Sequence, residues 1–162
     1  MLSGWRCALL GCLVAAPAAA KPVKSQGQVG IEALSRGAAE VVFVDKARAA
    51  IQTIRDNLAH TRLTDGARVI HTDALAFVRQ PAAPPFDVIY IAPPQYFELW
   101  VTALRAVDAA ATEWLTGDGV AIVQIDPREF QELPLINLVL SDQRRYGNTM
   151  LCFYRPTDDE EE

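Results

Sequence analysis

Residues 86–96 have the sequence Phe-Asp-Val-Ile-Tyr-Ile-Ala-Pro-Pro-Gln-Tyr. The first six are mostly β-branched, aromatic or otherwise apolar, which predicts a buried strand over residues 86–91. Pro93 and Pro94 follow almost at once; they stiffen the chain and remove two N–H donors. The segment is therefore either a rigid strand exit without a chemical role, or a loop that presents carbonyl oxygens and Tyr96 to a planar ligand.

On both sides of this stretch, helix and strand patterns alternate at short spacing. Short apolar runs predict strands at residues 41–44, 67–71, 86–91 and 119–125. The segments between them predict helices at residues 29–37, 46–58, 74–79 and 97–110. Two final apolar stretches, 136–140 and 149–154, flank a Tyr-Gly-Asn turn and predict a β-hairpin. We therefore predict an α/β fold with a doubly wound, Rossmann-like sheet, mostly parallel with a C-terminal antiparallel hairpin.

Length and composition limit the classes of protein to consider. A chain of 162 residues with 51% hydrophobic residues is long enough for one domain with a substantial core. The formal net charge of −5 argues against a broad basic surface for nucleic acid. The three cysteines form no CxxC pair and have no histidine at ligand spacing, so neither a zinc site nor a disulfide framework is expected. A reducing compartment fits this cysteine usage best.

The first 26 residues differ in composition from the rest of the chain. Arg6 precedes an apolar stretch that ends in an Ala-x-Ala pattern, which is typical of a secretory signal. The stretch is too short, and too interrupted by Pro17, to span a bilayer. A disordered leader and an irregular apolar segment packed on the domain are the alternatives. We divide the chain into a leader at 1–26, a domain at 27–156 and an acidic tail at 157–162.

Polar residues follow three of the predicted strands, at the edge of the sheet where such folds bind ligands. Asp45 can accept hydrogen bonds from a ribose diol, or it can cap the helix predicted to begin at Lys46. Asp73 can accept from an adenine amino group, although a helix cap for residues 74–79 is the simpler interpretation. Spacing alone does not separate these roles.

Two glycines, Gly27 and Gly30, stand just before a predicted helix. Their lack of a side chain would let backbone N–H groups approach a ligand closely. An ordinary tight turn is the alternative. A phosphate-binding loop is not indicated, because no Gly-Lys-Ser/Thr follows.

Taken together, these segments resemble the RsmD-like family of small-subunit ribosomal RNA guanine-N2 methyltransferases over residues 27–156. The string from Gly27 to Ala38 is similar to the second half of the family's glycine-rich motif and its helix, and Leu-Ser-Arg-Gly-Ala is distinctive within it. It continues at the right spacing into Val-Phe-Val-Asp45 and into the segment Thr72-Asp73-Ala74. Pro93 and Pro94 then fall where the family has its Asp/Asn-Pro-Pro-aromatic motif.

The resemblance implies a Rossmann-like methyltransferase sheet that uses S-adenosylmethionine. It implies that the cofactor is bound by Gly27, Gly30, Asp45, Lys46, Asp73 and Ala74. It implies that the target base is met by the residues of the proline loop, Ala92, Pro93, Pro94 and Tyr96. It further implies a cytoplasmic protein, expected to be a monomer without metal or membrane, whose partner is ribosomal RNA or the small ribosomal subunit.

Two departures from the family bear on function. Family members precede the glycine loop with a central strand of roughly Leu-Asp-Leu-Phe-Ala-Gly-Ser-Gly, whereas this chain has Ala20-Lys-Pro-Val-Lys-Ser-Gln-Gly27. Either residues 8–14 supply a substitute strand, or the domain is weakened by unpaired backbone groups. The abrupt change at residue 26 resembles a truncated or altered start of the family sequence more than a leader, which makes export a less favoured interpretation.

The second departure is Ala92, which stands where the family carries Asp or Asn. An alanine side chain cannot accept a hydrogen bond from the target amine, and Gln95 moves the aromatic residue one place later. The sequence therefore predicts an enzyme of reduced activity, or one that holds its substrate in a different geometry. The alternative is a catalytically impaired relative that binds RNA or a protein partner.

Overall fold

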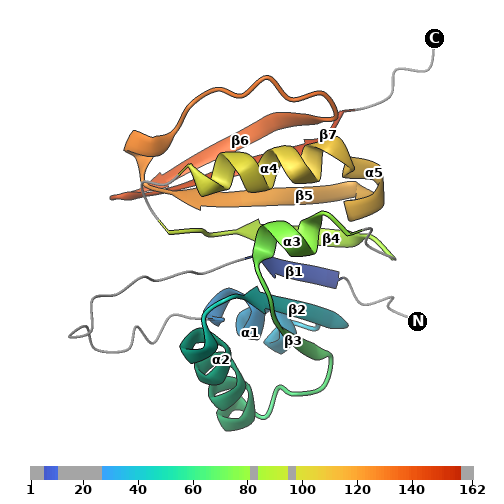
Figure 1. The fold of residues 1–162 in the computed structure, drawn as a ribbon, viewed down its shortest axis with the longest axis vertical. Coiled ribbons are helices and arrows are strands. Elements are labelled where there is room, and N and C mark those ends of the chain that lie inside the picture. Colours follow the sequence, from blue (N-terminus) through green and yellow to red (C-terminus); the bar gives the residue numbers. More distant parts are fainter. Residues whose placement is uncertain (1–5, 11–26, 81–83, 95–97, 158–162) are drawn as a thin grey trace.

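The fold is a single sheet of seven strands in the order β3-β2-β1-β4-β5-β7-β6 (Figure 1). The computed structural model describes residues 6–10, 27–80, 84–94 and 98–157. Its strands are β1 Arg6–Leu10, β2 Glu40–Asp45, β3 Ala67–His71, β4 Phe86–Ile91, β5 Leu115–Ile125, β6 Leu138–Tyr146 and β7 Thr149–Pro156. The first five are parallel, β7 runs antiparallel to β5, and β6 completes a hairpin with β7. The predicted α/β sheet, mostly parallel with a C-terminal antiparallel hairpin, is confirmed.

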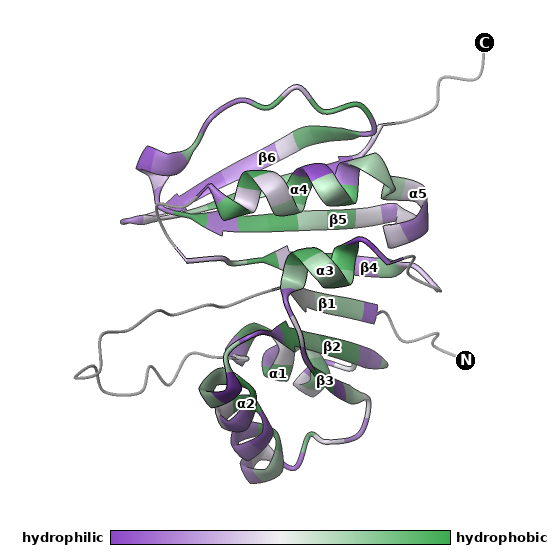
Figure 2. Ribbon diagram, viewed as in Figure 1, coloured by the Kyte–Doolittle hydropathy of each residue, from purple (hydrophilic) through white to green (hydrophobic). Residues whose placement is uncertain are grey.

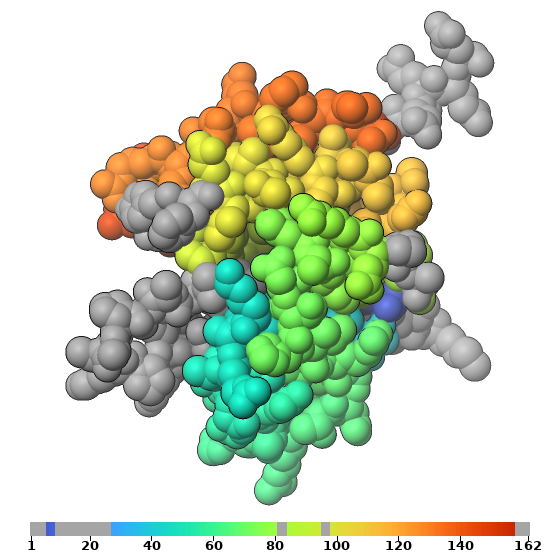
Figure 3. All heavy atoms as spheres, viewed as in Figure 1, coloured from blue at the N-terminus to red at the C-terminus, as the bar shows by residue number. Residues whose placement is uncertain are grey.

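Helices cover both faces of the sheet. They are α1 Gln28–Ser35, α2 Arg48–Thr61, α3 Ala74–Val78, α4 Leu99–Ala109 and α5 Ala111–Trp114, with a 3-10 turn at Pro127–Glu129. Val41 and Phe43 belong to a core cluster with residues of α1 and α2, whereas Val42 and Val44 belong to a second cluster with residues of α3, α4 and α5. This alternation follows from the period of two along a strand. Figure 3 shows α3 (green) and α4 (yellow) side by side over one of these faces.

The central strand, β1, lies inside the segment predicted to be a leader. Arg6–Leu10 pairs in parallel with β2 on one side and with β4 on the other. Of the two alternatives, a substitute strand or a domain without its central strand, the structure has the strand. It begins at Arg6 rather than at Ala8. Its apolar residues belong to the hydrophobic middle of the sheet in Figure 2.

Arg6 fixes the beginning of β1. Its backbone N–H donates to Asp87 Oδ2 at 2.6 Å, and its guanidinium Nε donates to Glu40 Oε2 at 2.6 Å. The guanidinium also donates to the carbonyls of Pro84 and Pro85 and lies 4.5 Å from the centroid of the Phe86 ring. These contacts join β1 to both of its neighbours at the amino end of the sheet.

Several boundaries differ from the predicted ones for identifiable reasons. Strand β5 begins at Leu115 rather than at residue 119, because the turn-like Thr-Gly-Asp segment is absorbed in an irregular register opposite Phe86 and Val88. Strand β6 continues to Tyr146, six residues beyond the apolar stretch, because it pairs with β7 along its whole length. Helix α2 begins at Arg48 rather than at Lys46. In the described part of the chain, no helix is both long enough and apolar enough to cross a membrane.

Candidate active site

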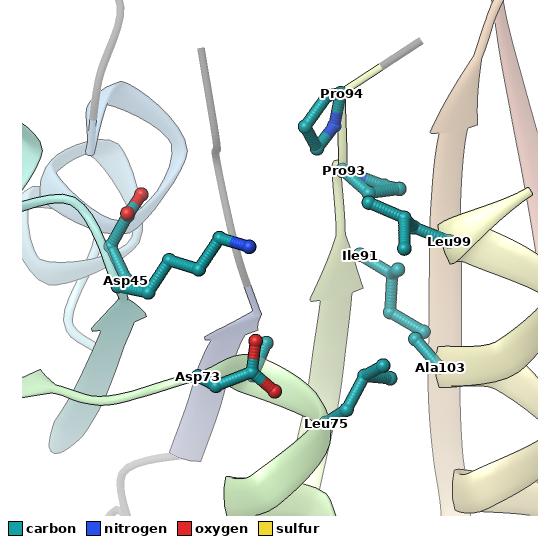
Figure 4. A pocket seen from close by; sticks show the side chains of 10 residues that line it. Asp45, Asp73, Leu75, Ile91, Pro93, Pro94, Leu99 and Ala103 are labelled. Atoms are coloured by element: carbon teal, nitrogen blue, oxygen red, sulfur yellow. The ribbon is translucent and has the colours of Figure 1, made fainter. Parts of the chain in front are cut away.

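One pocket opens at the carboxyl edge of the parallel strands. Its volume is about 500 Å³, including its opening to solvent. The lining comes from the ends of β2 and β4, from the start of α3 and from α4: Asp45, Lys46, Asp73, Ala74, Leu75, Ile91, Pro93, Pro94, Leu99 and Ala103. Six of the ten residues predicted for the site are among them. In Figure 4, Asp45 and the two prolines lie on opposite sides of the end of β1.

Asp45 ends β2 and is only 1% exposed. Its Oδ1 accepts a hydrogen bond from the backbone N–H of Ala47 at 2.7 Å. Ala47, not Asp45, is the N-cap residue of α2, so Asp45 orders the turn into the helix rather than capping its first turn. A carboxylate has about four acceptor sites, so this bond is compatible with a second one from a ligand hydroxyl.

Lys46 follows on the same turn, and its side chain is exposed. Its carbonyl lies 2.9 Å from the imidazole Nε2 of His71, which comes from the end of β3. This contact joins the ends of β2 and β3, and Lys46 is one of the residues that line the pocket.

Asp73 has the capping role that the sequence favoured. It is the N-cap of α3, and its Oδ1 accepts from the backbone N–H of Ala76 at 3.0 Å. The residue is nevertheless exposed and lines the pocket beside Ala74. Capping and contact with a ligand are therefore compatible at this position.

The proline loop follows directly from β4. Pro93 and Pro94 are half-buried and line the pocket, with the apolar side chains of Ile91 and Leu99 beside them. Ala92 is half-buried and is not among the lining residues. Tyr96, predicted to stack on the target base, lies outside the described residues. Its role stays a prediction.

The two glycines of the predicted cofactor loop do not line the pocket. Gly27 has φ of 80°, and a Cβ there would lie 3.1 Å from Ile54 Cγ1 and 3.5 Å from Phe43. Positive φ and this close approach both require glycine, so the tight turn accounts for Gly27. Gly30 is buried within α1. Their role toward a cofactor stays a prediction.

The sequence did not single out the apolar wall of the pocket, which consists of Leu75, Ile91, Leu99 and Ala103. These positions have the periodicity of ordinary core residues, and Leu75, Ile91 and Ala103 do pack in the larger hydrophobic core. No sequence signal separates an apolar residue that faces a pocket from one that faces the core. Only the geometry of the strand ends identifies them.

Neither the described cysteines nor the described acidic and histidine side chains form a further reactive site. Cys7 and Cys152 are free thiols; burial raises the pKa of Cys7 to about 12 and also raises the pKa of Cys152. Both are therefore protonated at neutral pH and unsuited to nucleophilic attack. Within the described residues, no three His, Cys, Asp or Glu side chains gather as a metal site would require.

Comparison with known proteins agrees with this arrangement. Residues 25–155 match the family described as Conserved hypothetical protein 95, which is the RsmD-like family. The chain belongs to this family. The resemblance predicted from the sequence is therefore confirmed, and it covers almost the same residues as predicted.

Two relatives in this family illustrate the similarity. YlbH of Bacillus subtilis, named as a candidate rRNA methyltransferase, is 35% identical over 133 residues, covering 80% of this chain and 70% of YlbH. Ribosomal RNA small subunit methyltransferase D of Haemophilus influenzae is 30% identical over 112 residues, covering 68% of this chain and 55% of that protein. The matched part of the RsmD-like chain thus spans 55% of one relative and 70% of the other.

Solved structures show the same fold. A Haemophilus influenzae protein described as a candidate methylase has a TM-score of 0.73 at 25% identity and covers 96% of this chain and 88% of its own. A conserved protein of Streptococcus pyogenes has a TM-score of 0.76 at 22% identity, with coverage of 98% and 89%. The second likeness concerns the fold alone.

Proposed function

We propose that this chain is an S-adenosylmethionine-dependent RNA methyltransferase that transfers a methyl group to the exocyclic N2 amine of a guanine in small-subunit ribosomal RNA. The observation that carries the proposal is the pocket. Residues predicted from separate parts of the sequence, on β2, α3 and the proline loop, converge on it. Membership of the RsmD-like family, with relatives named as rRNA methyltransferases, supports the choice of RNA as substrate.

The residues of the pocket fit an adenosine-type cofactor. Asp45 supplies an acceptor at the tip of β2 for a ribose hydroxyl, and Asp73 supplies one for an adenine amino group. Leu75 and Ile91 provide apolar surface for a flat ring. When bound, S-adenosylmethionine supplies an activated methyl group on a positively charged sulfur. The chain itself has to orient the target amine so that its lone pair faces that group.

At the target base, the proline loop limits what the chain can do. Ala92 has no side-chain acceptor, so the amine would depend on backbone carbonyls, such as that of Pro93, and on Tyr96 for stacking. Loss of one positioning hydrogen bond costs roughly 10²-fold in rate at comparable sites. We therefore expect slow turnover. We further propose that the protein works in the cytoplasm, as a monomer.

Ala92 is also the specific observation that favours a second candidate. In that alternative, the chain is a catalytically impaired methyltransferase-fold protein that binds RNA or a protein partner through the same edge of the sheet. It would still bind RNA or a partner protein but would transfer no methyl group.

Two measurements test the proposal in sequence. Titration of the purified chain with S-adenosylmethionine by calorimetry should give saturable binding in the micromolar range. Incubation with unmethylated small-subunit rRNA and labelled cofactor should then give N2-methylguanine, detected by mass spectrometry of the digested nucleosides. Cofactor binding without methylated product would favour the second candidate, and no cofactor binding would reject the proposed activity.

A further inference from the structure

The turn of the β6–β7 hairpin lies at the same edge of the sheet as the pocket. Strand pairing places Ile91, Val123, Cys152 and Gln143 in one row across β4, β5, β7 and β6. Because β7 is antiparallel to β5 and β6 is antiparallel to β7, β6 runs in the same direction as β4. Figure 1 shows the hairpin turn on the side to which β4 and β5 point.

The register also shows how far along the strand direction the residues near that turn lie, relative to the proline loop. Arg145 stands two positions beyond Gln143, as Pro93 stands two positions beyond Ile91. Three strand spacings separate β4 from β6, which is about 14 Å at ~4.8 Å per spacing. A short length of RNA strand can span this separation, so one nucleotide can enter the pocket while its neighbours pass the hairpin.

Arg145 lies on the face of the hairpin that also carries the pocket helices. It pairs with Met150, and Met150 packs against the core cluster that includes residues of α3 and α4. Side chains of directly paired residues lie on the same face of a sheet. The guanidinium therefore stands on the α3 and α4 side of the edge, as the pocket does.

Arg145 differs from two other arginines of this part of the molecule in the partner of its guanidinium. The neighbouring guanidinium groups of Arg128 and Arg144 are each hydrogen-bonded to a carboxylate at 2.9 Å, from Asp126 and Asp142 respectively. Arg145 Nε instead donates to the backbone carbonyl of Gly147 at 3.1 Å. Within the described ranges no carboxylate forms a salt bridge with Arg145. Its positive charge is thus available to an anionic partner.

Tyr146, next to Arg145, is 60% exposed at the end of the strand. Successive side chains of a strand point to opposite faces, so Tyr146 shares the face of Arg144 and points away from the pocket side. Arg145 is therefore the residue of this pair that can meet a phosphate on the pocket side. In Figure 2, β6 changes from hydrophobic at its beginning to hydrophilic toward this turn.

We propose that the end of the β6–β7 hairpin, through Arg145, binds a phosphate of the RNA strand beside the nucleotide that enters the pocket. The inference rests on the proposed function and adds a contact surface to it. It also explains how a chain with a net charge of −5 can bind a polyanion, since a local cation at the right edge is sufficient to direct the strand.

Charged residues on an edge strand also have a general use, because they discourage pairing with another sheet. That use accounts for the Asp142–Arg144 pair, which places both charges on exposed side chains of the edge strand. Protection of the edge strand does not depend on which end of the hairpin carries a positive charge. The proposed RNA contact depends on a positive charge at the end near the pocket, so a matched arginine at the other end separates the two explanations.

The matched residue is Arg155. It is exposed, lies on the same hairpin, and also donates to a backbone carbonyl, that of Asp118 at 3.0 Å, but at the opposite end of the sheet. The test compares Arg145→Glu with Arg155→Glu in the full chain. Affinity for unmethylated small-subunit rRNA is measured over a range of salt concentrations, and S-adenosylmethionine affinity is measured in parallel.

We expect Arg145→Glu to weaken RNA binding about tenfold at about 0.1 M salt, because it removes a charge-assisted hydrogen bond to a phosphate. The slope of log affinity against log salt should become shallower by about 0.7 for each phosphate that the variant no longer neutralises. Tyr146→Ala should leave RNA affinity within about twofold, because the ring lies on the opposite face of the sheet from Arg145. Arg155→Glu should change neither quantity, and cofactor affinity should be the same in all variants.

Four outcomes separate this inference from the proposed function. Equal effects of Arg145→Glu and Arg155→Glu would overturn the hairpin contact and leave the proposed function standing. Weakened binding of assembled small subunits, with unchanged binding of naked rRNA, would overturn the RNA contact in favour of a protein contact. Cofactor binding without any RNA binding would overturn the inference together with the choice of substrate. Arg145-dependent RNA binding without cofactor binding would support the hairpin surface and reject methyl transfer.

Discussion

At the scale of the residue, Asp45 combines a structural hydrogen bond with a place in the wall of the pocket. Its carboxylate orders the turn before α2 through Ala47, and it is almost fully buried. Asp126 is a close structural counterpart: it follows β5, is 4% exposed, and accepts the backbone N–H two residues later, at Arg128, at 2.9 Å. Both aspartates accept the backbone N–H two residues later, although Asp126 also caps the 3-10 turn and pairs with Arg128. Of the two, only Asp45 lines the pocket.

The first prediction uses this pair. Asp45→Asn should raise the dissociation constant of S-adenosylmethionine at least about tenfold, because a charged acceptor for the ribose is replaced by a neutral one. Both variants should lower thermal stability, because each weakens a hydrogen bond that orders a turn. Asp126→Asn should nevertheless leave cofactor affinity within about twofold of that of the unchanged chain. Calorimetry and thermal melting measure both quantities. Equal cofactor affinity in the two variants would mean that Asp45 acts only on the turn.

The second prediction concerns Ala92. Ala92→Asp adds a side-chain acceptor directly before Pro93, and should raise the rate of methyl transfer by roughly 10²-fold, with cofactor affinity unchanged. Ala92→Val, which adds bulk without an oxygen, is the control and should not raise the rate. Single-turnover assays with labelled cofactor measure the effect. Equal rates in the two variants would show that the missing acceptor is not what limits the reaction.

At the scale of the element, β1 is held by the ion pair between Arg6 and Glu40. Their side chains are 18% and 23% exposed, unlike the Arg36–Glu32 pair on α1, at 74% and 60%. Arg6→Ala should therefore reduce the free energy of unfolding by about 1–3 kcal/mol, since it also removes the contact with Phe86. Arg36→Ala should cost less than about 0.5 kcal/mol. Urea denaturation at neutral pH compares the two variants.

The same ion pair gives a pH dependence of known sign. Burial raises the pKa of Glu40, but hydrogen bonds and charges from Arg6 and Arg68 outweigh burial and hold its pKa below the ordinary value of 4.5. A carboxyl group whose pKa is lowered by folding adds stability above its unfolded pKa and loses it as pH falls through the folded pKa. The stability difference between the unchanged chain and Arg6→Ala should therefore shrink below pH 4.5. A difference that stays constant in this range would contradict the role of Glu40.

The elements also show what the sequence could and could not predict. Strands β3 and β4 were predicted to the residue, because each is a short apolar run between turn formers. Strand β1 was obscured, because Arg6 and the apolar residues after it have the composition of a secretory signal as well as of a buried strand. Asp45, Asp73 and the prolines could be predicted for the pocket from their places after strands. Leu75 and Ala103 could not, because pairing in space decides which core residues face it.

At the scale of the whole molecule, β1 joins two hydrophobic cores. Cys7, 1% exposed, belongs to the core beneath α1 and α2, whereas Ala8, 0% exposed, belongs to the core beneath α3, α4 and α5. The strand also lies between β2 and β4, which do not pair with each other. Both the backbone hydrogen bonds and the packing of the two halves of the sheet therefore pass through Arg6–Leu10.

The last prediction follows from this central position. A chain that begins at residue 27 should not fold cooperatively, because β2 and β4 would each leave a row of buried backbone groups unpaired, at about 1–3 kcal/mol for each group. A peptide of residues 1–26 added in trans should restore a cooperative melt by circular dichroism. The same peptide with Ala8→Arg should not, because that position has no exposure and cannot hold a charge. A cooperative melt of the shortened chain alone would show instead that the two halves of the sheet can fold together without β1, and that residues 1–26 are not required for folding.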